Sequence, residues 1–202
     1  MAETPDWPSY QIGPKSTVFA LGVVGINYAR LEYAVLGMFQ VILGLDNIVS
    51  RRLMFKMSNE QRDKIMREML PTWSWPENVH DLCWHFIKAN KICYENRNLL
   101  MHSNLMSGSE KAIVLYQTRR DGKVALARPT LPQLHRVADD MNGLWLFATI
   151  LAAKIRMDIL GLKPLAGDFA PPAWPDKPPL PIPLEYTEPP PPVTLRPPPA
   201  IR

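Results

Sequence analysis

One stretch of the sequence places an arginine and a histidine close together on a predicted helix. Residues 95–102 read Glu-Asn-Arg-Asn-Leu-Leu-Met-His, so four residues separate Arg97 from His102 and Asn98 directly follows the arginine. On an ideal helix the two side chains lie about 140° apart, which puts them on adjoining faces. A guanidinium makes a fixed, bidentate contact with phosphate, and an imidazole moves a proton near neutral pH. These three side chains therefore form a predicted phosphate site.

The spacing alone is not specific. With 13 arginines and 4 histidines among 202 residues, an Arg-His pair with four to six intervening residues is expected about 0.8 times by chance. A second match, Arg128 with His135, contains Pro129 and Pro132, so one continuous helix does not carry it. Whether residues 97–102 form a functional site therefore depends on their position in the fold.

Two charged residues fall on apolar faces of predicted helices. Seen down the helix axis, Arg97 and Glu32 each lie within about 60° of several apolar side chains. The apolar neighbours include Val79, Phe86, Cys93 and Leu100 for Arg97, and Leu21, Leu36, Phe39 and Leu43 for Glu32. A charge facing a core must be paired or must line a polar cleft. We expect Glu32 and Arg97 to lie near each other or to line one cleft, with Glu32 supporting Arg97; the alternative is a buried pair that only fixes helix register.

Long helices must position these residues. The first is expected to begin with a cap by Ser16 or Thr17 and to stop near Gly44 and Asn47. Capping boxes mark later helix starts at Ser58 with Gln61 and at Thr130 with Gln133. The predicted helices cover residues 17–45, 59–70, 77–104 and 131–160. Three long helices and a short one, joined by short connections, favour an all-α bundle.

A small β-hairpin is predicted before the last helix. Residues 111–117 and 123–128 are rich in β-prone side chains, and Asp121-Gly122 between them is a favoured hairpin turn. The hairpin is therefore an insertion into an otherwise helical domain.

Proline divides the chain into three parts. Fifteen of the 22 prolines lie in residues 164–202, which we expect to be an extended or disordered tail. The helical domain covers residues 15–163, and residues 1–14 form an N-terminal arm. Pro-x-x-Pro spacings such as Pro178 to Pro181 are expected from composition alone, although the tail offers a place for a protein partner to bind.

Composition and spacing exclude several classes of site. The chain has 2 cysteines, too few for a disulfide framework or a Cys₄ zinc site. Cys83 and Cys93 are about 15 Å apart along one helix and cannot bond to each other. His80 and His85 do not have the spacing of a helical zinc pair, and a Cys83–His80 nucleophile pair lacks any supporting signal. We expect no metal and no cofactor.

The N-terminus lacks the basic and apolar segments of a signal peptide. The most apolar stretch, residues 17–45, has Arg30 and Glu32 in its middle, and its two halves are too short to span a bilayer. We expect a cytoplasmic protein that does not contact a membrane.

Residues 1–163 carry 20 basic and 15 acidic side chains, a net charge of +5 that suits an anionic partner. Arg51-Arg52 and Arg119-Arg120 are small basic patches that could follow an RNA backbone. Three tryptophans near the start of the predicted helix 77–104 are expected to fill the core and to fix the start of that helix rather than to stack on bases. They are Trp73, Trp75 and Trp84.

Residues 97–102 lie near the C-terminal end of a long helix that is followed by one more core helix, and in this setting they resemble the motif of the HEPN superfamily. That motif is an arginine, four to six further residues and a histidine, commonly with a polar residue directly after the arginine, as Asn98 is here. The resemblance covers about residues 15–162 in helix order. It implies an all-α bundle, from which the hairpin and the proline-rich tail are departures.

The resemblance also implies an activity. Catalytic members are metal-independent endoribonucleases of toxin–antitoxin, phage-defence and RNA-processing systems, and they act as dimers whose motifs face each other across a cleft. Carried over, Arg97 would bind and neutralise the scissile phosphate, and His102 would be general base or acid while an RNA 2′-OH attacks phosphorus. Asn98 would orient one of them.

Two other functions remain open from the sequence. A non-catalytic helical binding or scaffold module predicts a structural Arg97–Glu32 pair and a tail that docks a partner. An RNA-binding subunit without cleavage predicts salt-dependent RNA binding that does not need His102.

Overall fold

The computed structural model describes residues 13–109, 112–118, 124–162 and 173–186. The helices are α1 (Lys15–Leu43), α2 (Asn47–Met54), α3 (Asn59–Met69), α4 (Glu77–His102) and α5 (Leu131–Lys154), with a 3₁₀ turn at Leu70–Thr72 and a π-helical turn at Ile155–Ile159. The strands are β1 (Asn104–Ser109), β2 (Ala112–Thr118) and β3 (Val124–Ala127). The mostly helical fold predicted from the sequence is confirmed.

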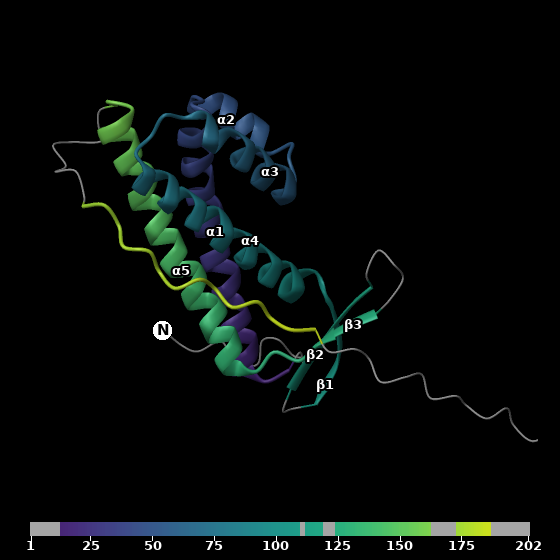
Figure 1. Cartoon of the computed structure of the whole chain (residues 1–202). Coiled ribbons are helices and arrows are strands. Elements are labelled where there is room, and N and C mark those ends of the chain that lie inside the picture. The colour runs from purple at the N-terminus through teal and green to yellow at the C-terminus, as the bar shows by residue number, and fades with distance from the viewer. Residues whose placement is uncertain (1–12, 110–111, 119–123, 163–172, 187–202) are drawn as a thin grey trace, which may run out of the picture.

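The three long helices pack side by side, with the sheet at one end and α2 and α3 at the other (Figure 1). Helices α1 and α5 run in the same direction, because Asn27 contacts Ala138 and Gly37 lies beside Ala152. Helix α4 runs against them, so its C-terminal end lies near the sheet. Large side chains from all three helices fill the core; among the most buried are Leu31, Met38, Phe39, Phe86, Ile87, Met141 and Leu144.

Both predicted capping boxes are present. In the first, the Ser58 hydroxyl accepts from Gln61 N–H; in the second, Thr130 accepts from Gln133, and each glutamine side chain accepts in return from the cap residue's N–H. Helix α1 differs from expectation, since it begins at Lys15 after Pro14 with no side-chain cap. Pro14 fixes the backbone just outside the helix, so the start does not depend on a hydroxyl.

The structure adds two elements to the predicted set. Helix α2 was missed, because Gly44 and Asn47 were interpreted as an end, whereas the Asp46 carboxylate caps a new helix by accepting from the N–H groups of Ile48 and Val49. Strand β1 was also missed. It pairs antiparallel with β2, which pairs with β3 as the hairpin prediction required, so the sheet has three strands in the order β1-β2-β3.

Residues 173–186, here called the strap, lie along the groove between α4 and α5 (Figure 1). The strap contains no helix or strand, and every third residue faces the bundle. These inward residues are Pro175, Pro178, Pro181 and Leu184, of which the last two are buried. A period of three is that of a polyproline II helix. The Pro-x-x-Pro spacing therefore has a packing role within this chain.

The strap's backbone is held by one buried side chain of α4. The amide of Asn96, 3% exposed, donates to the Ile182 carbonyl at 3.0 Å and accepts from Leu184 N–H at 2.8 Å. An ion pair between Lys177 and Asp81 lies nearer the start of the strap. This pairing fixes the strap's register on the groove.

Helix α1 is long and apolar enough to cross a bilayer by length and composition alone. A core helix of a soluble protein passes the same test. Arg30 and Glu32 in the middle of α1 therefore do not by themselves exclude that this helix spans a membrane.

Candidate functional site

The last two turns of α4 bring Arg97, Asn98 and His102 into contact. Nη1 of Arg97 donates to Oδ1 of Asn98 at 3.2 Å and also contacts Nε2 of His102. The arginine side chain is long enough to bridge the predicted angle of about 140° between the two positions. Helix α4 ends at His102, which is exposed, whereas Arg97 and Asn98 are half-buried. The predicted triplet is therefore assembled at an open helix end.

Arg97 and His102 supply two different chemical groups at the helix end. The guanidinium has hydrogen-bond donors only and lies against Nε2 of the imidazole. An imidazole in its neutral form can act as a base, and a bound phosphate would compete with Nε2 for the guanidinium.

The ring of Tyr28 on α1 lies against the guanidinium of Arg97. The Arg97 guanidinium carbon lies 5.1 Å from the centre of the Tyr28 ring. The phenol is buried, and its oxygen accepts from Nδ2 of Asn59 on α3 at 3.0 Å. Burial is the largest cause of the raised pKa of Tyr28, so the ring stays neutral. The sequence analysis does not single out Tyr28, because nothing near it in the sequence signals a partner far along the chain.

The prediction for Glu32 is corrected by the structure. Its side chain is 49% exposed and forms an ion pair at 4.0 Å with Arg62, so it does not point into the core. No ion pair joins it to Arg97 among the described residues. Both charges act on Tyr28, with Glu32 raising its pKa and Arg97 lowering it. The helical projection failed because α1 is apolar on its solvent side as well as its core side.

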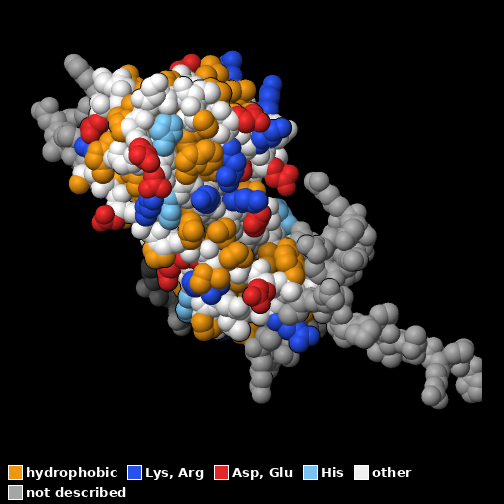
Figure 2. Space-filling model, viewed as in Figure 1, with side chains coloured by type: hydrophobic (Ala, Val, Ile, Leu, Met, Phe, Trp, Pro, Cys, Tyr) orange, Lys and Arg blue, Asp and Glu red, His pale blue; other side chains and the backbone are white. Residues whose placement is uncertain are grey.

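The predicted basic patch at Arg51-Arg52 is not part of this site. Arg51 and Arg52 are exposed on α2, at the opposite end of the bundle from the end of α4 (Figure 1). Nε of Arg51 donates to Asn47 of its own helix. Arg119 and Arg120 lie outside the described residues. On the face viewed in Figure 2, Lys and Arg side chains are interspersed with acidic and apolar ones.

Other predicted chemistry is accounted for by packing. Cys83 and Cys93 are buried, and burial raises the pKa of each thiol to about 12, so neither is a ready nucleophile. Trp73 and Trp75 stack on each other at 5.3 Å, and Trp73 donates to the Ile42 carbonyl at the end of α1. Among the described residues, no group of three or more His, Cys, Asp or Glu is placed to hold a metal ion.

Comparison of the chain with protein-family models, with curated proteins and with solved structures finds no match. The candidate site must therefore be interpreted from its own geometry.

Proposed function

We propose that the protein is a metal-independent endoribonuclease of the HEPN type, with Arg97 and His102 as its catalytic pair. The contact between the Arg97 guanidinium and the His102 imidazole at the exposed end of α4 is the observation that carries the proposal. A fixed positive charge beside a base is the pair of groups that cleavage of a phosphodiester by its own 2′-OH requires.

The proposed step begins when the scissile phosphate draws Arg97 to its oxygens and frees Nε2 of His102. The 2′ oxygen forms a bond to phosphorus while its proton passes to Nε2. The bond from phosphorus to the 5′ oxygen breaks, and that oxygen leaves with a proton from water or from the histidine of a second copy. The products are a 2′,3′-cyclic phosphate and a 5′-hydroxyl. Asn98 keeps Arg97 oriented through its carbonyl oxygen.

The partners that belong to this proposal are RNA and a second copy of the chain, and no metal or cofactor takes part. A toxin–antitoxin or phage-defence setting and a cytoplasmic location follow from the family resemblance and stay predictions. The scaffold alternative has lost its specific support, because Glu32 pairs with Arg62 instead of Arg97.

The test is RNA cleavage by the purified full chain in the presence of EDTA. We expect wild type to cleave, and Arg97→Ala or His102→Ala to lower the rate by about 10²-fold or more. Cleaved ends should carry cyclic phosphate. Equal cleavage by all three proteins, or cleavage that EDTA abolishes, would contradict the proposal.

The chain provides a matched control in its second Arg-His spacing. Arg128 and His135 are both exposed, and prolines separate them, so Arg128→Ala and His135→Ala remove the same two side-chain types elsewhere. Both controls should cleave RNA at the wild-type rate. A variant at 97 or 102 that binds RNA normally but does not cleave it would separate catalysis from binding.

A further inference from the structure

Helix α2 packs one side against the bundle and leaves its other side exposed. Ser50 and Met54, one turn apart, are its two buried residues. Ile48 and Phe55 are seven residues apart, so they lie along one line on the other side of the helix. Their side chains are 66% and 89% exposed among the described residues. The helix therefore turns large apolar side chains toward solvent.

The exposed side of α2 combines apolar with basic side chains. We call this set the α2 patch; its members are Ile48, Val49, Arg51, Arg52, Leu53, Phe55 and Lys56, all of them exposed. The four apolar members expose roughly 400 Å² of surface, a size that marks interaction sites on soluble proteins. No Asp or Glu occurs in residues 47–59. The patch is therefore positive as well as apolar.

The basic side chains of the α2 patch are not engaged in ion pairs. Elsewhere in the described part of the chain, ion pairs join charged side chains of α1, α3, α4, α5 and the strap, and none of them includes Arg51, Arg52 or Lys56. Arg51 donates to Asn47 of its own helix, a neutral partner that does not compensate its charge. The uncompensated positive charge suits an anionic partner.

Both ends of α2 are held by neighbouring groups. At the N-terminal end, the Asp46 carboxylate accepts from the N–H groups of Ile48 and Val49. At the C-terminal end, the Arg62 guanidinium of α3 donates to the Met54 carbonyl. A helix this short does not form alone in water, so these contacts build the patch before any partner arrives. A preformed patch binds without the entropic cost of folding.

We propose that the α2 patch docks on the surface of a membrane that contains anionic phospholipids. Apolar side chains beside lysine and arginine allow a helix to lie in the membrane interface, because the apolar groups enter the boundary between headgroups and acyl chains while the cations contact lipid phosphates. Ile48 and Phe55, the most exposed apolar members, enter this boundary, and Arg52 and Lys56 between them meet the headgroups.

This contact is peripheral, and no helix crosses the bilayer. It revises the expectation that the protein does not contact a membrane. That expectation rested on the lack of a signal peptide and on the charges within residues 17–45, and neither observation concerns a surface that lies on a membrane.

The apolar members of the patch favour a membrane over RNA as the anionic partner. RNA phosphates would use the cations, and RNA bases stack on aromatic rings, of which the patch contains only Phe55. Ile48, Val49 and Leu53 are aliphatic. A phosphate backbone offers nothing to cover them, whereas lipid acyl chains do.

Docking through α2 leaves the proposed catalytic pair in solution. Helix α2 lies at one end of the bundle and the C-terminal end of α4 at the other (Figure 1). With 26 residues, α4 is about 39 Å long. Arg97 and His102 therefore stay open to RNA while α2 is on the membrane. This consequence rests on the proposed function, and the docking itself does not.

The first test is cosedimentation of the purified full chain with lipid vesicles at physiological ionic strength. We expect binding to phosphatidylcholine vesicles that contain about 30% phosphatidylserine and no binding to phosphatidylcholine alone, because the cations add affinity only at a negative surface. Binding should weaken as the salt concentration rises. Equal binding to both kinds of vesicle, or binding to neither, would overturn the proposal.

A charge reversal tests the basic side chains. Arg52→Glu should lower the affinity for phosphatidylserine vesicles about thirtyfold, since each charge near the surface contributes about fivefold. Arg128→Glu is the matched control, because Arg128 is exposed next to the sheet at the opposite end of the bundle. This variant should bind as wild type does. An equal loss in both variants would show that affinity follows net charge alone, and the proposal would fail.

A second pair of variants tests the apolar side chains. Phe55→Asp should lower the affinity about tenfold or more, because the ring no longer enters the interface. Phe19→Asp is the matched control: Phe19 is 73% exposed at the start of α1, the end of that helix far from α2. Its variant should bind normally. Loss of binding in Phe19→Asp, with normal binding in Phe55→Asp, would assign the contact to α1 instead.

A fluorescent label locates the contact directly. The native cysteines Cys83 and Cys93 are buried, so an environment-sensitive dye reacts with a cysteine introduced on the surface. The emission of labelled Val49→Cys should shift to the blue when phosphatidylserine vesicles are added. The emission of labelled Asp139→Cys, exposed on α5, should not shift. A shift at position 139 without one at position 49 would place the contact elsewhere and overturn the proposal.

RNA binding is measured with the same variants. If Arg52→Glu lost RNA binding but kept wild-type affinity for vesicles, the patch would be an RNA site and the proposal would be wrong. Vesicle binding by a chain that does not cleave RNA refutes only the proposed function. RNA cleavage by a chain that does not bind vesicles refutes only the docking.

Discussion

Two apolar surfaces of the described part of the bundle differ in whether they are covered. The groove between α4 and α5 is covered by the strap, whose Pro181 and Leu184 are buried there. A stripe on α1, made of Phe19, Ile26 and Tyr33, is exposed among the described residues. Both surfaces lie on long helices of the same domain, so helical amphipathicity alone does not distinguish them. The difference lies in what surrounds each surface.

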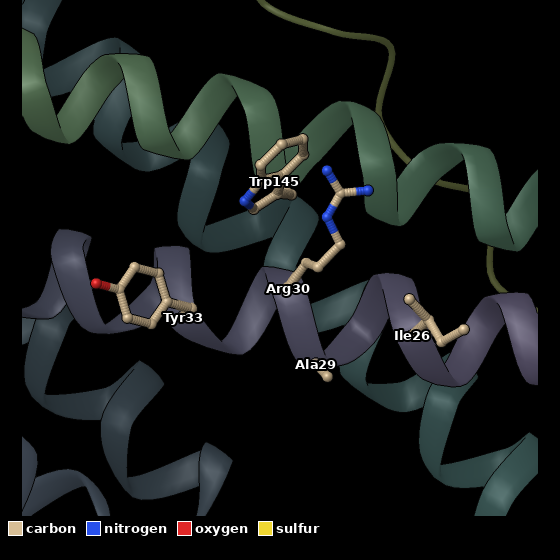
Figure 3. A pocket seen from close by; sticks show the side chains of 5 residues that line it. All are labelled: Ile26, Ala29, Arg30, Tyr33 and Trp145. Atoms are coloured by element: carbon tan, nitrogen blue, oxygen red, sulfur yellow. The ribbon is translucent and has the colours of Figure 1, made fainter.

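The covered groove has a polar anchor. Asn96 matches one backbone carbonyl and one N–H of the strap, a contact that fixes register and direction without using the strap's side chains. The open stripe has no such anchor at its centre; its features are a hollow and the small residues Gly22 and Ala29. The buried amide of Asn96 therefore recognises an extended backbone, whereas the shallow hollow on α1 (Figure 3) is lined by side chains alone.

The largest effect is expected from removing the strap, which would make the two surfaces alike. A chain ending at residue 172 loses the burial of Pro181 and Leu184 and both Asn96 hydrogen bonds. We expect a loss of about 3–5 kcal/mol in the free energy of unfolding and a fall in Tm of roughly 10 °C. Thermal unfolding followed by circular dichroism measures this.

The control for that truncation is a chain ending at Tyr186, which keeps the strap and should unfold at the wild-type temperature. A synthetic peptide of residues 173–186, added to the shorter chain, should restore its Tm and should not affect the full chain. If the peptide has no effect at millimolar concentration, the groove does not recognise the strap independently of its connection.

Asn96 and Asn98, two residues apart on α4, have different expected roles: Asn96 holds the strap, and Asn98 contacts the proposed catalytic pair. Asn96→Ala leaves the Ile182 carbonyl and the Leu184 N–H without their partner, and should cost about 1–3 kcal/mol in the free energy of unfolding. Asn98→Ala should leave Tm unchanged and lower the rate of RNA cleavage, because among the described residues the hydrogen bond of its side chain is to Arg97. Parallel denaturation and cleavage assays of the two variants check this; identical behaviour would contradict the assignment of separate roles.

A smaller effect is expected from substitutions of Tyr28 on α1, whose ring lies against Arg97 of the proposed catalytic pair. Tyr28→Leu removes the ring that lies against Arg97 and should slow cleavage by about fivefold, since a cation–π contact of this kind is worth about 1 kcal/mol. Tyr28→Phe keeps the ring and should retain most of the activity. Equal losses in both variants would show that the hydrogen bond to Asn59 matters instead.

The smallest expected effect is a pH dependence of stability caused by His85, which lies against the strap. Burial is the main cause of the lowered pKa of His85, with Lys177 and Lys88 lowering it further; the carbonyl of Pro178 and the carboxylate of Asp81 raise it. A group with a lowered pKa stabilises the fold above its unfolded value of 6.5, and this contribution is lost as pH falls through the folded pKa.

Tm should therefore fall between pH 7 and pH 5.5. Asp140, at the backbone of Ile182 in the strap, acts in the opposite direction, since burial raises the pKa of its carboxyl, so the fall in Tm should be modest. His85→Phe removes the titrating group, and its Tm should vary less over this range. A fall of the same size in that variant would place the titration elsewhere.

Local signals in the sequence predicted most of the helices and the hairpin. Ser58 and Thr130 are capping residues whose partners lie three positions away, so a short window contains the whole interaction. The Arg97–His102 contact was also predictable, because both residues lie on one helix. Helix α2 was missed because the residues that close α1 also precede a new cap at Asp46.

The features that the sequence did not predict depend on contacts between segments that are far apart in the chain. Tyr28 meets Arg97 across two helices, and nothing near it in the sequence indicates that contact. Glu32 was misplaced because a projection cannot tell which apolar side of α1 is buried. The spacing of three in the strap is visible in the sequence, but the amide that recognises it, Asn96, belongs to a helix 86 residues away from Ile182.

The order of α1 and the strap along the chain sets an order of events during synthesis. Residues 19–36 leave the ribosome long before residues 173–186, and segments made first begin to fold first. In a nascent chain the apolar side of α1 is therefore present while the groove between α4 and α5 is still bare. The groove is covered only after residues 173–186 have been made, so closure of the strap reports that translation has passed that point.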